Sequence, residues 1–243
     1  MYHTLINISL AAAIALSLCG CNAKKAANIE TDTVEYETQT ASVYIERPTF
    51  SIRKNKDVEN KLNKQFDDEI NSMLVAFDTT SANAGELLGG NKCVFELHIK
   101  EMYNENDFLS ILSDTYEYTG GAHGQSVWTA YNIDTLNGNT VLLADLFEKN
   151  DYIPILEHLI DTELEKKPDE YGDLWERPKI KDENQKNFYI SPDGLTIFYE
   201  PYDLSYYARG VVEFTLPNDE IKPIVKEEYK KLFNTEGMNT ANN

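Results

Sequence analysis

Hydrophobic residues recur along this chain with two different spacings, one typical of helices and one typical of strands. Apolar side chains recur every three or four positions, with charged residues between them, over residues 57–77, 152–166 and 219–233. Pro154 suits the first turn of the second segment, and Pro223 is compatible with the third only in its first turn. We therefore expect about three packed amphipathic helices.

Alternation of apolar and polar residues predicts strands between these helices. The clearest pair is 93–103 and 108–118, which the polar residues 104–107 join as a β-hairpin. Ser191-Pro-Asp-Gly194 has the composition of a tight turn between two further strands. Residues 41–54 predict an edge strand that is interrupted at Pro48. Shorter strands are predicted over residues 126–133, 188–190, 195–199 and 210–216. The predicted fold class is α+β, with one or more antiparallel sheets and the helices packed on them.

A glycine-rich segment, Tyr118-Thr-Gly-Gly-Ala-His-Gly124, interrupts the alternating pattern. Glycine adopts positive φ angles that other residues resist, so this segment predicts a loop whose backbone packs closely against something. One interpretation is a structural turn, and the other is a ligand-binding loop in which His123 is the titratable group. The candidate ligand-binding residues here are Tyr118, Gly120, Gly121, His123 and Gly124.

A second candidate segment is rich in tyrosine and runs from Pro201 to Gly210. Its candidate ligand-binding residues are Tyr202, Tyr206 and Tyr207, because phenol rings stack on sugars and anchor protein partners. The alternative is that these tyrosines pack back on the sheet.

The N-terminus predicts export and anchoring. Residues 5–18 form an apolar run of the length found in signal peptides. The run ends in Leu18-Cys-Gly-Cys21, which resembles a bacterial lipobox and implies cleavage before Cys21 and acylation of its sulfur, with chains such as palmitate. We expect a signal peptide over 1–20, a tether over 21–40, and a lipid-anchored protein on the periplasmic or surface face of a cell-envelope membrane. An ordinary secretory signal with incidental cysteines is the alternative, and Cys93 is expected to be a buried, inert thiol.

Charge and histidine spacing narrow the candidate functions. The chain of 243 residues has 41 acidic and 22 basic side chains and a net charge of −19, which argues against nucleic acid and favours either a cationic partner or simple solubility. The histidines, His3, His98, His123 and His158, are not spaced as ligand pairs, so we expect no metal and no other cofactor. Neither a nucleophile elbow nor a Cys/His motif is present, and we therefore assign no catalytic residue.

Several motifs together carry a family resemblance. They are Tyr118-Thr-Gly-Gly-Ala-His-Gly124, Tyr131-Asn132, Leu143-Ala-Asp-Leu-Phe147, Phe188-Tyr-Ile190 with Asp193-Gly194, and the segment 201–210. This combination resembles a domain of unknown function shared by the C-terminal part of the anti-sigma-V factor and by a peptidoglycan deacetylase outside its catalytic domain. The resemblance implies an N-terminal α+β subdomain over 41–114, a C-terminal domain of antiparallel strands and packed helices over 115–234, and a tail over 235–243.

The resemblance also suggests a function. The extracellular region of the anti-sigma-V factor is a receptor for lysozyme, and a basic lysozyme would suit an acidic receptor. We therefore favour a non-enzymatic, lipid-anchored binding protein of the cell envelope that recognises a lysozyme-like protein or peptidoglycan. The alternatives are an envelope glycan hydrolase that uses His123 with Asp145 or Asp203, and a purely structural lipoprotein.

Overall fold

The computed structural model describes residues 25–84, 91–148 and 151–234. The predicted signal peptide, Cys21 and the C-terminal tail lie outside these residues. The chain divides into two compact units. The first unit contains residues 27–100 and 113–128, and the second contains residues 101–112 and 129 onward, so that the boundary falls within three of the strands.

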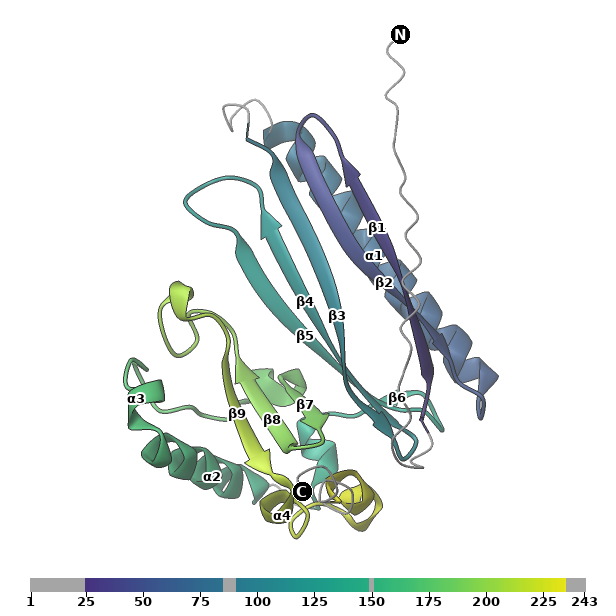
Figure 1. Cartoon of the computed structure of the whole chain (residues 1–243). Helices are drawn as coiled ribbons and strands as arrows, with labels where there is room; N and C mark the ends of the chain where they lie inside the picture. The colour runs from purple at the N-terminus through teal and green to yellow at the C-terminus, as the bar shows by residue number, and fades with distance from the viewer. Residues whose placement is uncertain (1–24, 85–90, 149–150, 235–243) are drawn as a thin grey trace, which may run out of the picture. The chain divides into compact units, whose positions relative to one another are not determined.

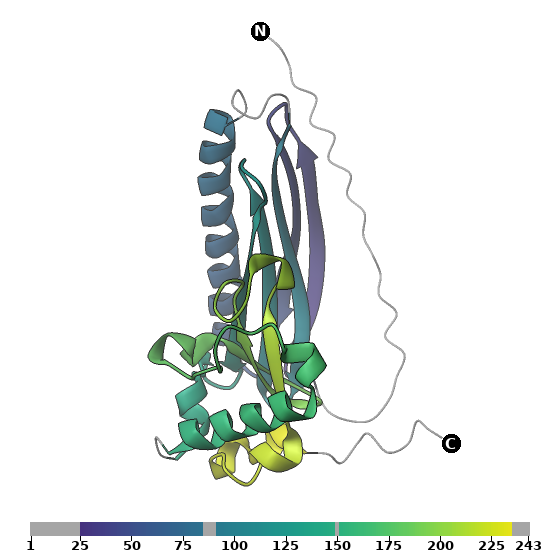
Figure 2. The same ribbon diagram turned by 90° about the vertical axis from the view of Figure 1, so that its left-hand side faces the viewer.

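A six-stranded sheet has the strand order β1-β2-β3-β4-β5-β6 (Figure 1). In the first unit, the helix α1 (Lys56–Ala84) runs along one face of this sheet (Figure 2). Figure 1 labels the strands as β1 (Asn28–Glu37), β2 (Ala41–Ser51), β3 (Cys93–Glu105), β4 (Phe108–Tyr118), β5 (Gln125–Asp134) and β6 (Asn139–Thr140). The predicted hairpin of residues 93–118 is therefore confirmed as β3 and β4.

The prediction of a tether is wrong for residues 28–37, which form β1. This strand pairs antiparallel with β2 along its whole length, from Asn28 opposite Ser51 to Glu37 opposite Ser42. It lies at the edge of the sheet, where charged and polar side chains are common because they discourage pairing with another chain. A strand in this position needs no strong apolar alternation, and for that reason the pattern did not reveal it.

The predicted α+β fold class is confirmed, and the six-stranded sheet is mixed because one of its strand pairs is parallel. β2 pairs parallel with β3 from Ala41 to Ile45, opposite Cys93 to Leu97. The physical reason is the connection between them, because a helix of 29 residues separates the two strands and allows the chain to return in the same direction. Cys93 is buried in the core beneath α1, as predicted, with Phe77 and Phe95.

Polar side chains of α1 hold the second half of β2, where the pairing with β3 has ended. The Asn63 amide forms two hydrogen bonds with Phe50, since its Oδ1 accepts from the Phe50 N–H at 2.8 Å and its Nδ2 donates to the Phe50 carbonyl at 2.9 Å. One turn earlier, Glu59 Oε2 accepts from the Ile52 N–H at 2.9 Å. The helix therefore takes over part of the role of a neighbouring strand.

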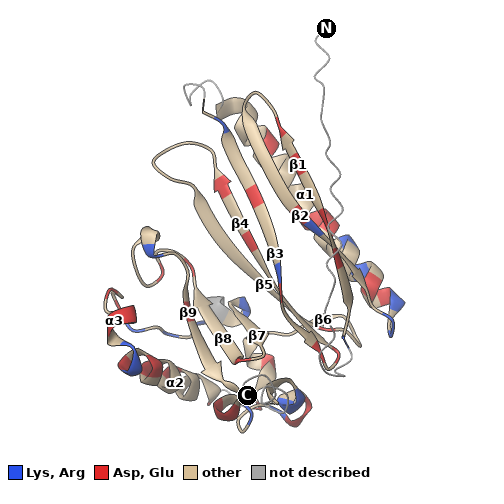
Figure 3. Ribbon diagram, viewed as in Figure 1, with Lys and Arg blue, Asp and Glu red and all other residues tan. Residues whose placement is uncertain are grey.

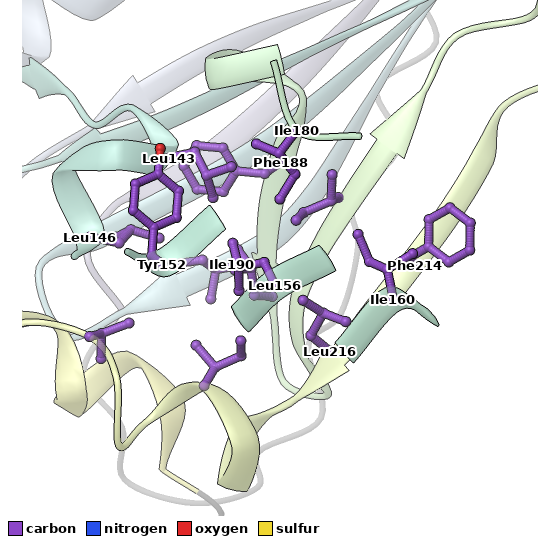
Figure 4. Packing of buried hydrophobic residues seen from close by; sticks show 14 of the residues in the cluster. Leu143, Leu146, Tyr152, Leu156, Ile160, Ile180, Phe188, Ile190, Phe214 and Leu216 are labelled. Carbon is purple, nitrogen blue, oxygen red and sulfur yellow. The ribbon is translucent and has the colours of Figure 1, made fainter. Parts of the chain in front are cut away.

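The second unit contains an antiparallel sheet of three strands, β7 (Phe188–Ser191), β8 (Gly194–Tyr199) and β9 (Val212–Pro217). The helix α2 (Tyr152–Lys166) has the predicted bounds and contributes Leu156 and Ile160 to the core (Figure 4). The short helices of this unit include η1 (Leu143–Leu146), α3 (Pro168–Tyr171), η2 (Asp182–Lys186) and η3 (Tyr207–Arg209).

The predicted helix over residues 219–233 is wrong, because two shorter elements replace it. α4 (Asn218–Ile221) and η4 (Glu227–Phe233) are separated by a segment in which Val225 forms a β-bridge with Phe147. Pro223 lies two residues after the end of α4, which is beyond the first turn of a helix that starts near residue 219. Its ring and missing N–H disfavour a continuous helix there.

A buried polar network joins parts of the second unit that are distant in sequence. The Ser110 hydroxyl donates to Asn132 Oδ1 at 2.6 Å and accepts from the Ile190 N–H at 3.1 Å. Asn132 Nδ2 in turn donates to the Phe188 carbonyl at 2.7 Å. These bonds tie β4 and β5 to β7 within this unit.

Candidate functional site

The tyrosine segment, residues 201–210, belongs to the second unit, and two of its tyrosines are exposed. Tyr202 is 55% exposed and Tyr206 is 49% exposed. Tyr207 is half-buried, and its ring centroid lies 5.6 Å from that of Tyr202. The alternative in which the tyrosines pack back on the sheet therefore does not describe Tyr202 or Tyr206.

Tyr202 has a backbone conformation that is unusual for its residue type. Its φ angle is 76°, in the left-handed region that disfavours side chains with a Cβ. Such a conformation costs about 1–2 kcal/mol in an ordinary residue and persists only where the surroundings impose it. The surroundings are fixed by hydrogen bonds on both sides of the segment.

The interior of the tyrosine segment is attached to the loop after α3. Leu204 and Ser205 are buried. The Trp175 N–H donates to the Leu204 carbonyl at 2.8 Å, and the Ser205 hydroxyl donates to the Asp173 carbonyl at 3.1 Å. Because this buried pair lies between the exposed residues Tyr202 and Tyr206, the segment presents both tyrosines from a fixed backbone.

Arg209 holds the end of the segment. Its guanidinium forms an ion pair with the Asp173 carboxylate, donates from Nη2 to the Glu170 carbonyl at 2.7 Å, and lies 5.8 Å from the centre of the Tyr171 ring. The side chain of Arg209 is only 18% exposed, so this pair is more strongly coupled than a surface ion pair. Sequence reasoning missed Arg209 and Asp173, because they are separated by 36 positions and neither has a local motif.

A small cleft adjoins the tyrosine segment within the second unit. Its cavity volume is about 140 Å³, and it is lined by Glu176, Lys179, Lys181, Asn187, Tyr199, Asp203 and Leu204. Acidic and basic residues both occur along α2, whereas the charged residues of α3 are Asp169 and Glu170 (Figure 3). The Tyr199 hydroxyl donates to the Lys179 carbonyl at 3.1 Å. Burial raises the pKa of Tyr199, and the nearby carboxylates of Glu157 and Asp203 raise it further by a smaller amount. The Tyr199 side chain therefore stays a neutral hydrogen-bonding group.

The glycine-rich segment connects β4 and β5 and belongs to the first unit. Gly120 and Gly121 have φ angles of 118° and 96°, which explains the need for glycine there. Gly124 is buried, and a Cβ on it would lie 2.5 Å from the Tyr116 ring. The Tyr118 hydroxyl donates to the Gly121 carbonyl at 3.2 Å. These contacts give the segment a structural function, and a binding role for it stays a prediction.

His123 is exposed, and its Nδ1 donates to the Gly124 carbonyl at 2.7 Å. Asp145 and Asp203, the carboxylates considered for a hydrolase, both accept backbone N–H groups, from Leu142 at 2.8 Å and from Glu200 at 2.9 Å. Both aspartates belong to the second unit, whereas His123 belongs to the first. Among the described residues, no group of three or more His, Cys, Asp or Glu side chains is arranged to hold a metal ion.

Within the described part of the chain, no helix combines the length and the apolar character that crossing a bilayer requires. Cys21 lies outside the described residues, and its lipidation stays a prediction from the sequence.

Comparison with known proteins gives two domain matches. Residues 34–126 match the family described as "Deacetylase PdaC", and residues 144–219 match DUF3298, described as a protein of unknown function. The peptidoglycan-N-acetylmuramic acid deacetylase PdaC of Bacillus subtilis (strain 168) is 24% identical over 206 residues, which are 83% of this chain and 43% of the deacetylase. The anti-sigma-V factor RsiV of the same organism is 24% identical over 241 residues, which are 94% of this chain and 81% of that protein.

Solved structures with similar folds include two proteins of the DUF3298 family. The protein BF2082 from Bacteroides fragilis NCTC 9343 has a TM-score of 0.65 and 18% identity, over 88% of this chain and 99% of that one. The protein PA4972 from Pseudomonas aeruginosa PAO1 has a TM-score of 0.58 and 17% identity, over 83% and 95% of the two chains. These matches confirm the α+β fold and the resemblance inferred from the sequence motifs. The chain thus carries a PdaC-type domain followed by a DUF3298 domain, and it is a distant homologue of the deacetylase PdaC and of the anti-sigma-V factor RsiV.

Proposed function

We propose that this protein is a non-enzymatic, lipid-anchored binding protein of the cell envelope, which uses its tyrosine segment to recognise peptidoglycan. The observation that carries the proposal is Tyr202, whose ring is 55% exposed although its backbone is held at a φ angle of 76°. A protein gains no core packing from such a residue. Strained positions that present a side chain outward cluster at binding sites, where a fixed geometry reduces the entropy lost on binding.

The choice of peptidoglycan rests on the tyrosines and on the homology. Flat aromatic side chains, partly exposed, suit the apolar faces of sugar rings. The homologous deacetylase acts on peptidoglycan, according to its name, and the chain spans 43% of its length. Acylation of Cys21 would place the binding unit at a membrane of the envelope.

The charge of the chain favours a second candidate partner, a cationic protein such as a basic lysozyme. The chain carries 41 acidic and 22 basic residues. An acidic surface accelerates association with a basic partner and makes the association sensitive to salt. Exposed tyrosines would also suit the centre of a protein interface.

A binding experiment with two probes tests this proposal. The protein without residues 1–20, and with Cys21→Ser, is incubated with purified peptidoglycan sacculi and, separately, with a basic lysozyme. We expect it to sediment with sacculi, and we expect the double variant Tyr202→Ala, Tyr206→Ala to lose about tenfold or more in affinity. Leu136→Ala is the matched control, because Leu136 is an exposed apolar residue of the same unit, 48% exposed and outside the tyrosine segment.

The two probes separate the candidate partners. Binding to lysozyme alone, with loss in the double variant, would replace peptidoglycan by the cationic partner. Binding to neither probe, or equal binding by the double variant and the control, would refute a recognition role for the tyrosine segment. The anchor is tested separately, because only a chain with Cys21 intact should incorporate radiolabelled palmitate and fractionate with membranes.

A further inference from the structure

The cleft beside the tyrosine segment combines groups of both charges. Glu176, Asp203, Lys179 and Lys181 line it, together with the amide of Asn187. The charged groups of the lining are thus two carboxylates and two ammonium groups, whose charges balance. The lining therefore favours neither an anion nor a cation strongly, and it offers hydrogen-bond donors and acceptors side by side.

Such a lining suits a ligand that carries many hydroxyl groups and no charge. A hydroxyl both donates and accepts, so it can bond to a carboxylate at one position and to an ammonium or amide at the next. Asp203 Oδ2 accepts the Glu200 N–H at 2.9 Å, and this bond fixes the carboxylate in orientation beside the cleft. Fixed polar groups in a concave site are the usual determinants of ligand orientation.

Two exposed aromatic residues, Trp175 and Tyr202, are adjacent in sequence to residues that line the cleft. Trp175 is 62% exposed, precedes the lining residue Glu176, and donates its N–H to the carbonyl of the lining residue Leu204 at 2.8 Å. Tyr202, 55% exposed, precedes the lining residue Asp203. Exposed aromatic residues directly before polar lining residues suit a sugar, since a pyranose ring has an apolar face and a polar rim.

We propose that this cleft is a saccharide subsite that holds one uncharged pyranose ring of a glycan. Asp203, Asn187 and Lys179 hydrogen-bond the hydroxyl groups of the ring, and Trp175 contributes apolar surface at the edge of the subsite. The inference rests on the proposed function in its glycan form and adds the position of the subsite and the class of ligand. The volume, about 140 Å³, sets the size of the ligand. It holds on the order of ten water molecules, and it falls below the range of about 300–1,000 Å³ found for larger ligands, so it takes a single ring rather than a chain.

The chain offers a specific reporter for this subsite, because it contains two tryptophans, Trp128 and Trp175. A Trp128→Phe background leaves Trp175 as the source of indole emission. The protein in this background, without residues 1–20 and with Cys21→Ser, is titrated with a soluble β-1,4-linked N-acetylglucosamine tetramer. We expect a saturable change in the emission of Trp175.

Two variants and a control locate the binding. Asp203→Asn keeps an oxygen for the Glu200 N–H but removes the charge, and Asn187→Ala removes the amide, so each should weaken binding by about tenfold. Asp219→Asn is the matched control, because Asp219 lies in the same unit and does not line this cleft. Circular dichroism spectra that match the parent exclude loss of fold in each variant.

Three outcomes would overturn the subsite. They are no saturable change with the tetramer, equal affinity for Asp203→Asn and Asp219→Asn, and a stronger Trp175 response to a tetra-arginine peptide than to the tetramer. The proposed function fails differently. If the tetramer binds but the protein does not sediment with sacculi, the subsite stands and peptidoglycan recognition fails. If the protein binds sacculi through Tyr202 and Tyr206 but does not bind the tetramer, peptidoglycan recognition stands and the subsite fails.

Discussion

Asn63 in α1 should be more important for stability than its half-buried position suggests. Its amide satisfies both the N–H and the carbonyl of Phe50, at 2.8 and 2.9 Å, and the Phe50 side chain is fully buried. Asn63→Ala removes both bonds and leaves two backbone groups without these partners. Each hydrogen bond contributes about 1 kcal/mol, and a buried group left unpaired costs about 1–3 kcal/mol, so we expect a loss of about 2–3 kcal/mol.

The helix propensity of alanine works against this loss. Replacing asparagine by alanine in a helix stabilises it by about 0.5 kcal/mol. Asn60→Ala makes the same chemical change at an exposed position of the same helix. It is therefore the matched control, and we expect it to be neutral or slightly stabilising.

The measurement is urea unfolding followed by far-ultraviolet circular dichroism. We expect the midpoint of Asn63→Ala to fall while the m-value stays constant, since a change in the m-value would indicate altered compactness. Asn63→Asp still accepts from the Phe50 N–H but places a carboxylate at the Phe50 carbonyl, so it should be destabilised above the pKa of that carboxylate and recover on acidification. If Asn63→Ala and Asn60→Ala differ by less than about 0.5 kcal/mol, the side chain does not substitute for a strand.

Three further predictions concern other parts of the fold. Gly194→Ala should destabilise the second unit by more than about 3 kcal/mol, because the new Cβ would lie 2.0 Å from the Leu216 carbonyl oxygen. Thermal unfolding measures this loss, and a small effect would mean that the turn can move to accommodate the Cβ. The hydrogen bond from Lys56, and to a smaller extent that from the Ile52 N–H, lowers the pKa of Glu59. The stability that this carboxylate contributes is therefore present above the ordinary glutamate pKa of about 4.3 and is lost as the pH falls. Glu59→Gln should flatten the pH dependence of the free energy of unfolding below about pH 5, and an unchanged pH dependence in this variant would contradict the prediction. Cys93 is buried, and burial raises the pKa of its thiol. In a variant without Cys19 and Cys21, a thiol reagent at about pH 8 should therefore react with Cys93 only after the protein unfolds. Rapid labelling of Cys93 in the native protein would contradict its burial.

Elements with strong local signals were predictable from the sequence. The apolar spacing of residues 152–166 gave α2 its bounds, because this helix has a polar exterior and a proline in its first turn. The turn between β7 and β8 followed from Ser191-Pro-Asp-Gly194, where Gly194 has a φ angle of 150°. In both cases the information lies within a few positions of the element itself.

Elements that depend on distant partners were not predictable. β1 forms because β2 offers it an edge, and its own residues include Glu30, Asp32 and Glu35, which indicate no buried face. The candidate site shows the same division. The tyrosines were visible as a run of one residue type, whereas Trp175 joins the site through a backbone bond to Leu204, a partner 29 positions away that no local pattern reveals.

The early start of β1 changes how far an anchored molecule could extend. If Cys21 is acylated, only six residues, 22–27, lie between it and Asn28. The seven residue steps from Cys21 to Asn28 span at most about 25 Å when extended, compared with about 70 Å for a tether of twenty residues. The folded part would then stay within the layer of the envelope closest to its membrane. It would contact only targets that lie in or diffuse into this narrow zone, and it could not reach targets deeper in the cell wall.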